Sequence, residues 1–156
     1  MKPSPNGWPR ISSSIFYEDA GAAIDWLGRA FGLEPRIIVE GAAGEIIHSE
    51  LTFGEGVVMV GSAGKSPWTR SPRGQAGACT QALFVYVDDV ERHCARARAA
   101  GATIATEPQT NDYGDEHWVD RSYEAVDCEG HHWWFAERLA TGTQPRQGGV
   151  RVKESG

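Results

Sequence analysis

The chain has 156 residues, of which 40% are hydrophobic and 23% are charged, and this composition predicts a globular protein of one domain or of two small halves that pack together. The formal net charge of −6 argues against a nucleic-acid partner, because such a partner needs a basic face. No apolar run approaches the roughly 20 residues of a membrane span, so we expect no membrane partner either.

The cellular setting is predicted from the first residues and the cysteines. Residues 1–10, an N-terminal extension, lack the apolar stretch of a secretory signal, so we predict a cytoplasmic protein. The three cysteines, Cys79, Cys94 and Cys128, are far apart and odd in number. They match neither a disulfide framework nor a Cys-x-x-Cys zinc site, and we expect reduced thiols.

Residues 11–62 predict one module with the order strand, helix, strand, strand, strand. The segment "ISSSIFY" has the composition of a strand, and Asp19 and Gly32 are a suitable N-cap and C-cap for the helix that follows. Apolar residues recur at helical spacing between these two caps. Three further strand-like segments complete the module: "RIIVE", "EIIHSELTF" and "GVVMVG".

Residues 80–138 predict a second module of the same order. "ALFVYV" precedes a helix between Asp88 and Gly101, and "ATIAT", "DRSYEAVD" and "HHWWFA" follow it. Asp88 and Gly101 match Asp19 and Gly32 at a constant offset, which indicates an internal duplication. We expect residues 63–79, rich in Gly, Ser and Pro, to form a surface linker, and residues 139–156 to form a flexible tail.

This duplicated unit resembles the vicinal oxygen chelate superfamily, which includes glyoxalase I, extradiol dioxygenases and the bleomycin- and fosfomycin-resistance proteins. The resemblance covers about residues 11–138 and rests on "IDWLGRAFGLE", "VYVDDVERHCARARAAGA" and the closing "VDCEGHHWWF". It implies an α+β fold in which two tandem β-α-β-β-β modules form a curved mixed sheet around a central cleft. It also implies a homodimer.

In metal-dependent members of this superfamily, the first and last strands of each module supply His or Glu ligands. The resemblance carries those positions to the following residues: Ser13, Ala82, Met59 or Val60, and Trp134 or Trp133. Alanine and tryptophan offer no metal donor, and serine and a thioether are unusual ones. We therefore expect no metal at this site and no cofactor.

His48 and Glu50 are the strongest candidates for polar chemistry. Two residues apart on a strand, they share one face, and a two-residue hairpin at residues 53–56 would bring Met59 opposite Glu50. Three interpretations remain open. The pair is a general acid and base that contacts a ligand, or it forms a displaced metal site with His132, or it orders the cleft wall or a dimer interface.

The remaining cleft candidates are mostly aromatic. Strand alternation sends His132 and Trp134 to the cleft and their neighbours His131 and Trp133 to the other face. Arg121 and Tyr123 share a strand face, where they either bind a polar or anionic group or form an ordinary surface pair. His93 lies among charged helix residues and is expected to be solvated. The full set of predicted ligand-binding residues is Tyr17, Met59, Phe84, Tyr86, Arg121, Tyr123, His132 and Trp134.

Aromatic walls with few polar groups suit flat apolar or cationic ligands. The sequence therefore predicts metal-independent binding of a small aromatic or cationic organic molecule, with drug sequestration as one such role, as the resemblance to the bleomycin-resistance branch implies. One alternative is a glyoxalase-like lyase or isomerase that uses His48 and Glu50, with or without a divalent metal. Another is a catalytically silent interaction module.

Overall fold

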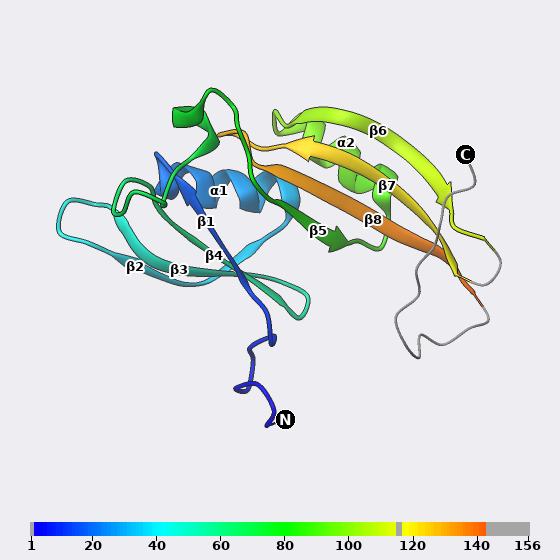
Figure 1. Ribbon diagram of the computed structural model, residues 1–156, viewed down its shortest axis with the longest axis horizontal. Helices are drawn as coiled ribbons and strands as arrows, with labels where there is room; N and C mark the ends of the chain where they lie inside the picture. The colour runs from blue at the N-terminus through cyan, green and yellow to red at the C-terminus, as the bar shows by residue number, and fades with distance from the viewer. Residues whose placement is uncertain (1, 115–116, 143–156) are drawn as a thin grey trace.

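The computed structural model describes residues 2–114 and 117–142, which form two modules of identical order lying side by side (Figure 1). The first module consists of β1 (Ser13–Tyr17), α1 (Ala20–Phe31), β2 (Glu34–Glu40), β3 (Ile46–Phe53) and β4 (Gly56–Ser62). The second consists of β5 (Ala82–Tyr86), α2 (Val90–Ala99), β6 (Thr103–Asp112), β7 (Trp118–Val126) and β8 (His132–Thr141). The predicted duplication and the α+β class are confirmed.

Each module builds its own mixed sheet of four strands. The strand orders are β1-β4-β3-β2 and β5-β8-β7-β6. In each sheet the first strand runs parallel to the last, and the other neighbours are antiparallel. The two sheets remain separate and do not close into a barrel, so β1 and β5 each stand at an edge of their sheet.

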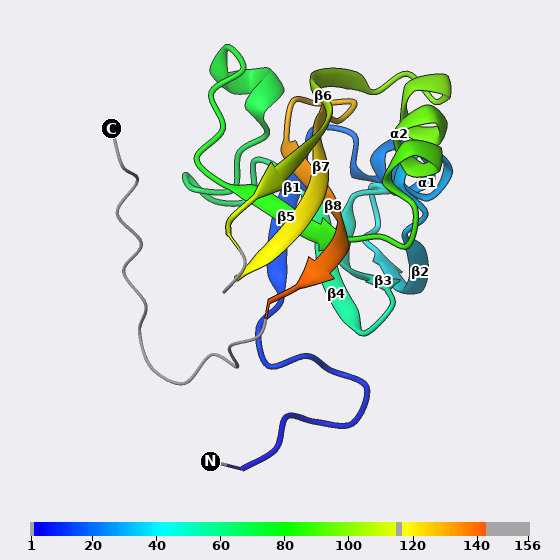
Figure 2. The ribbon, with the colours of Figure 1, turned by 90° about the vertical axis from the view of Figure 1, so that its right-hand side faces the viewer.

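One helix covers one face of each sheet, and the two helices contact each other (Figure 2). The α1 residues at helical spacing are all buried, including Ile24, Leu27 and Phe31. Trp26 donates its indole N–H to the carbonyl of Ala100 at 2.9 Å, and Arg96 donates to that of Gly28 at 2.6 Å. Side-chain bonds between the helices thus join the two modules.

His93 corrects one sequence expectation, because it is not solvated. Its Nδ1 lies 2.7 Å from the hydroxyl of Tyr123, and its Nε2 lies 3.0 Å from the carbonyl oxygen of Phe31. The rings of Phe31 and Phe135 lie against it. Burial lowers the pKa of His93, which favours the neutral imidazole. The charged neighbours in the sequence point elsewhere, because residues one or two apart lie on different sides of a helix.

The helix caps confirm the first module and shift the register of the second. Asp19 accepts a hydrogen bond from the backbone N–H of Ala22 at 3.0 Å, and Gly32 ends α1 at a φ of 81°. The N-cap of α2 is Asp89, which accepts from Arg92, rather than the preceding Asp88. Because two aspartates follow each other, the sequence did not show which of them caps α2. With Asp89 as the cap, each residue of the second module matches one position earlier in the first, and Ala82 corresponds to Ser12 rather than to Ser13.

The turn between β7 and β8 ties the linker and both modules together. The carboxylate of Glu129 accepts from the backbone N–H groups of Glu18 at 2.7 Å and Asp19 at 2.9 Å, and from the Ser71 hydroxyl at 2.5 Å. Asp127 accepts from the hydroxyl of Tyr17 at 2.6 Å. The linker therefore has structure of its own, including a 3-10 turn at Pro72–Gln75, with Ser71 buried.

The strands of the second module are longer than predicted. β6 continues to Asp112 and β8 continues to Thr141, so part of the predicted tail belongs to the sheet. Gly142 follows β8, and residues 143–156 of the predicted tail lie outside the described residues. None of the helices in residues 2–114 and 117–142 is long and apolar enough to cross a membrane.

Candidate functional site: a groove along β5

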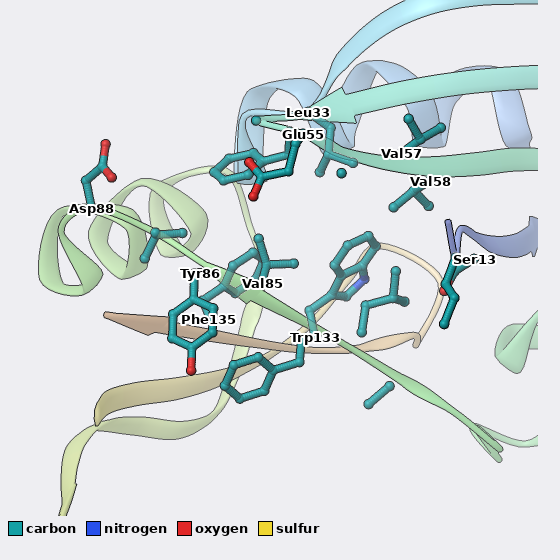
Figure 3. A pocket seen from close by; sticks show the side chains of 18 residues that line it. Ser13, Leu33, Glu55, Val57, Val58, Val85, Tyr86, Asp88, Trp133 and Phe135 are labelled. Carbon is teal, nitrogen blue, oxygen red and sulfur yellow. The ribbon is translucent and has the colours of Figure 1, made fainter. Parts of the chain in front are cut away.

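A groove of about 780 Å³ lies between the β3–β4 hairpin of the first module and strands β5 and β8 of the second (Figure 3). Val57 and Val58 stand on one side of it, and Trp133 and Val85 stand on the opposite side. Residues from both faces of β5 line it, so the groove follows the edge of this strand that no other strand pairs. Its volume suits a small organic molecule.

The groove is mostly apolar, and its few charges are negative. Trp133 and Phe135, with 0% and 1% exposure, are core residues directly behind it, whereas Phe84 and Tyr86 are 58% and 49% exposed at its rim. Among the described residues that line it, Glu55 is the carboxylate at the hairpin tip, and the β5–α2 junction adds the carboxylate of Asp88. Lysine, arginine and histidine are absent from the part of this lining that residues 2–114 and 117–142 supply. The site is therefore chemically suited to an apolar body with a neutral or positive polar group.

The face of the second sheet away from α2, called here the open face, adjoins the groove at β5. Strand register aligns Phe84 with Trp134 and Glu124 across this face. His132 lies beside them, with its Nδ1 2.7 Å from a carboxylate oxygen of Glu124. Further along β5, the hydroxyl of Tyr86 donates to Asp120 at 3.1 Å. Aromatic rings thus extend from the groove rim onto this face.

The structure brings together only some of the predicted ligand-binding residues. Phe84 and Tyr86 line the groove. Trp134 and His132 share the open face with them but do not line the groove. Met59 lies on the other sheet, where its sulfur is 3.9 Å from the hydroxyl of Ser14. Trp133, which strand alternation sent to the other face, is buried behind the groove, and Phe135 beside it was not among the predicted residues.

Three predicted residues lie instead on the helix-covered faces. Tyr17 and Tyr123 are both 0% exposed, and burial raises the pKa of each hydroxyl. Arg121 forms an ion pair with Glu91 of α2, with 2.5 Å between nitrogen and oxygen. The reason is register: Tyr123 pairs with Phe135, so strand alternation turns both Tyr123 and Arg121 toward the helix.

His48 and Glu50 form the expected pair, with 3.1 Å between the imidazole Nε2 and the carboxylate. Arg36 also donates to this carboxylate, at 2.7 Å. The hydrogen bond from His48 and the contact with Arg36 lower the pKa of Glu50, so the carboxylate is a weak base at neutral pH. Neither His48 nor Glu50 lines the groove. Their arrangement fits a pair that orders the sheet face better than one that transfers protons.

The cysteine thiols are the other side chains that could act as nucleophiles. The three cysteines are free thiols, as predicted. Burial and the neighbouring carboxylates of Asp127 and Glu129 raise the pKa of Cys128 to about 12, so its thiolate is scarce at neutral pH.

The residues present do not fit the metal that the superfamily resemblance implies. The positions that would supply ligands face different ways. Ser13 lies on the helix-covered side of β1, as does Ile15, whereas Ala82 lies on the open face, opposite His132. Trp134 presents an indole where a ligand would be needed. Within residues 2–114 and 117–142, no three His, Cys, Asp or Glu side chains gather in a way that could hold an ion. This includes His48, Glu50 and His132, which lie on different sheets.

Comparison with known proteins agrees with this architecture. The chain is 31% identical over 131 residues to the uncharacterized protein Rv0887c of Mycobacterium tuberculosis, a match that covers 80% of this chain and 72% of that protein. The crystal structure of TioX from Micromonospora sp. ML1 superposes with a TM-score of 0.64 at 33% identity, covering 84% of this chain and 99% of TioX. TnmS3 from Streptomyces sp. CB03234, described as an antibiotic binding protein, shares the fold with a TM-score of 0.59 at 16% identity, covering 81% and 93% of the two chains.

The glyoxalase family model, described as the Glyoxalase/Bleomycin resistance protein/Dioxygenase superfamily, matches residues 10–135. That range contains both β-α-β-β-β modules except the end of β8. The chain belongs to the Glyoxalase/Bleomycin resistance protein/Dioxygenase superfamily.

Proposed function

We propose that this protein binds a small, flat, apolar or cationic organic molecule in the groove along β5 without a metal ion. The observation that carries this proposal is the mostly apolar groove of about 780 Å³ with the exposed rings of Phe84 and Tyr86 at its rim. Exposed aromatic rings beside a cavity are a common mark of ligand sites. A fold that serves antibiotic binding in TnmS3 is consistent with this role, including drug sequestration.

Charge supports a preference for cations among such ligands. The carboxylates of Glu55 and Asp88 belong to the groove lining, and the chain carries a formal net charge of −6. A cation over an aromatic face gains about 0.5–2 kcal/mol, with the larger value where water is excluded. An aromatic cation would therefore use both the rings and the carboxylates.

The test is a titration of the protein with a panel of planar aromatic compounds, both neutral and cationic. Tryptophan fluorescence is the signal that reports binding. Phe84→Ala is expected to weaken binding about fivefold, because one stacked ring is worth about 1 kcal/mol. Ile47→Ala is the matched control, since Ile47 is a strand residue with 55% exposure that does not line the groove. Equal loss of affinity in both variants, or none in either, would contradict the proposed site.

The same titration separates binding from the enzymatic alternative. His48→Ala and Glu50→Gln are expected to leave ligand affinity unchanged, because neither side chain lines the groove. Turnover of a bound compound that disappears in both variants, with folding intact, would favour the glyoxalase-like reaction instead.

We also propose that the protein is a homodimer. Large apolar side chains are exposed on both sheets: Ile37 and Val39 of β2 are 45% and 39% exposed on one, and Phe84 and Tyr86 of β5 are exposed on the other. Patches of this kind usually mark an interface. Sedimentation velocity is expected to give the mass of two chains, and Ile37→Glu should shift it toward one. A monomer at all concentrations would disprove the dimer while leaving ligand binding untouched.

A further inference from the structure

Next to the groove, the guanidinium of Arg138 lies against two aromatic rings and a carboxylate. The guanidinium carbon of Arg138 lies 5.1 Å from the ring centre of Tyr86 and 5.2 Å from that of Trp118. The same guanidinium donates to the carboxylate of Asp120 and to the hydroxyl of Tyr86. Two aromatic rings and a carboxylate are the groups that proteins use to hold planar cations.

The carboxylate of this site is buried, whereas its occupant is partly exposed to solvent. Asp120 is 5% exposed and accepts from Tyr86 at 3.1 Å, and Tyr86 itself packs edge-on against Phe84 with 5.4 Å between ring centres. Arg138 lies near the end of β8, and its side chain is 34% exposed. Its long side chain can rotate into water and regain rotamer freedom when it leaves the rings. Removing Arg138 without a substitute would leave the buried carboxylate unpaired, so the site favours exchange of one cation for another.

Tyr86 belongs to both sites, because it lines the groove and forms one side of the Arg138 site. A ligand lying against Phe84 at the groove rim therefore has its far end beside Tyr86 and Asp120. We propose that the Asp120–Tyr86–Trp118 site receives the amidinium or guanidinium group of a ligand, and that Arg138 competes with this group as an internal occupant. This inference rests on the proposed function, and it adds the ligand's charged group and the residue that limits its affinity.

The experiment compares benzamidine with its neutral analogue benzamide in wild type and in Arg138→Gln, by calorimetry or tryptophan fluorescence. Gln retains an amide donor for Asp120 but carries no charge, so benzamidine is expected to bind about tenfold more tightly to the variant, while benzamide changes by less than about twofold. Asp120→Asn added to Arg138→Gln should remove the gain. Arg98→Gln is the matched control, because Arg98 pairs with Glu107 at 2.7 Å away from both sites.

Equal benzamidine affinity in wild type and Arg138→Gln would overturn the inference, and so would an equal gain for benzamide. If Arg138→Gln does not fold, Arg138→Lys takes its place, since a compact ammonium leaves the rings more readily and should give a smaller gain for benzamidine alone. Failure of the proposed function would give a different result from failure of this inference. In that case no compound binds in a Phe84-dependent way, yet benzamidine still binds Arg138→Gln through Asp120.

Discussion

Replacing Trp133 by alanine is expected to lower the free energy of unfolding by about 4 kcal/mol, the usual cost of removing a large buried aromatic side chain. Trp133 is 0% exposed and contacts Phe31 with 5.3 Å between ring centres. Its indole N–H also donates to Asp127 at 3.0 Å, so the substitution leaves a buried carboxylate with one donor fewer. Urea unfolding followed by circular dichroism measures the change.

Trp134→Ala is the matched control, since the two tryptophans are adjacent but face opposite sides of the sheet. Trp134 is only half-buried on the open face, and its loss is expected to cost about 1 kcal/mol. Trp133→Phe should recover most of the stability while losing the bond to Asp127. Equal destabilisation by Trp133→Ala and Trp134→Ala would contradict the assignment of Trp133 to the buried face of β8 and of Trp134 to the open face.

Replacing Glu129 by alanine is expected to cost about 3 kcal/mol, because it leaves several buried donors without an acceptor. The carboxylate is 2% exposed and serves two backbone N–H groups at the start of α1 together with the hydroxyl of Ser71. It therefore joins the second module, the first helix and the linker. Glu40→Ala, an exposed carboxylate on β2, is the control and should change stability by less than about 0.5 kcal/mol.

The contribution of Glu129 should also depend on pH. Burial alone would raise its pKa, but the hydrogen bonds from Ser71, Asp19 and Glu18 outweigh burial, and the pKa lies below the ordinary value of 4.5. A folded pKa below the unfolded one gives stability that is fully present above pH 4.5 and is lost as the pH falls through the folded value. The difference in unfolding free energy between wild type and Glu129→Gln should therefore shrink below pH 4.5. A difference that stays constant down to pH 2 would contradict this assignment.

Local patterns in the sequence were sufficient to predict the modules. Period-two alternation placed Phe84 and Tyr86 on the cleft side of their strand, and it separated Trp133 from Trp134. Caps at Asp19 and Gly32 gave the bounds of α1. These features depend on contacts between near neighbours, which the chain order itself determines.

The predictions were wrong where contacts between residues distant in the sequence determine the length of a strand or the direction of a side chain. The predicted strand at residues 102–106 stopped short of Pro108, yet β6 passes through this proline because β6 is the outer strand of its sheet and a register shift accommodates it. Tyr123 was assigned to the cleft by residue type, and only its pairing with Phe135 shows that it faces α2.

The groove itself could not be predicted from either module alone. Val57 and Trp133 line opposite sides of it, and they come from different modules (Figure 3). Their approach depends on how the helices contact each other, through bonds such as that from Arg96 to Gly28. No short sequence pattern determines how closely the two modules approach each other.

The most direct test of the central claim is one titration performed twice, before and after exhaustive dialysis against EDTA. It uses the planar compound that binds most tightly in a Phe84-dependent manner, with metal content measured on the same samples. Metal-independent binding predicts the same dissociation constant in both, within about twofold. Loss of binding after dialysis, with recovery on addition of a divalent ion, would contradict the account.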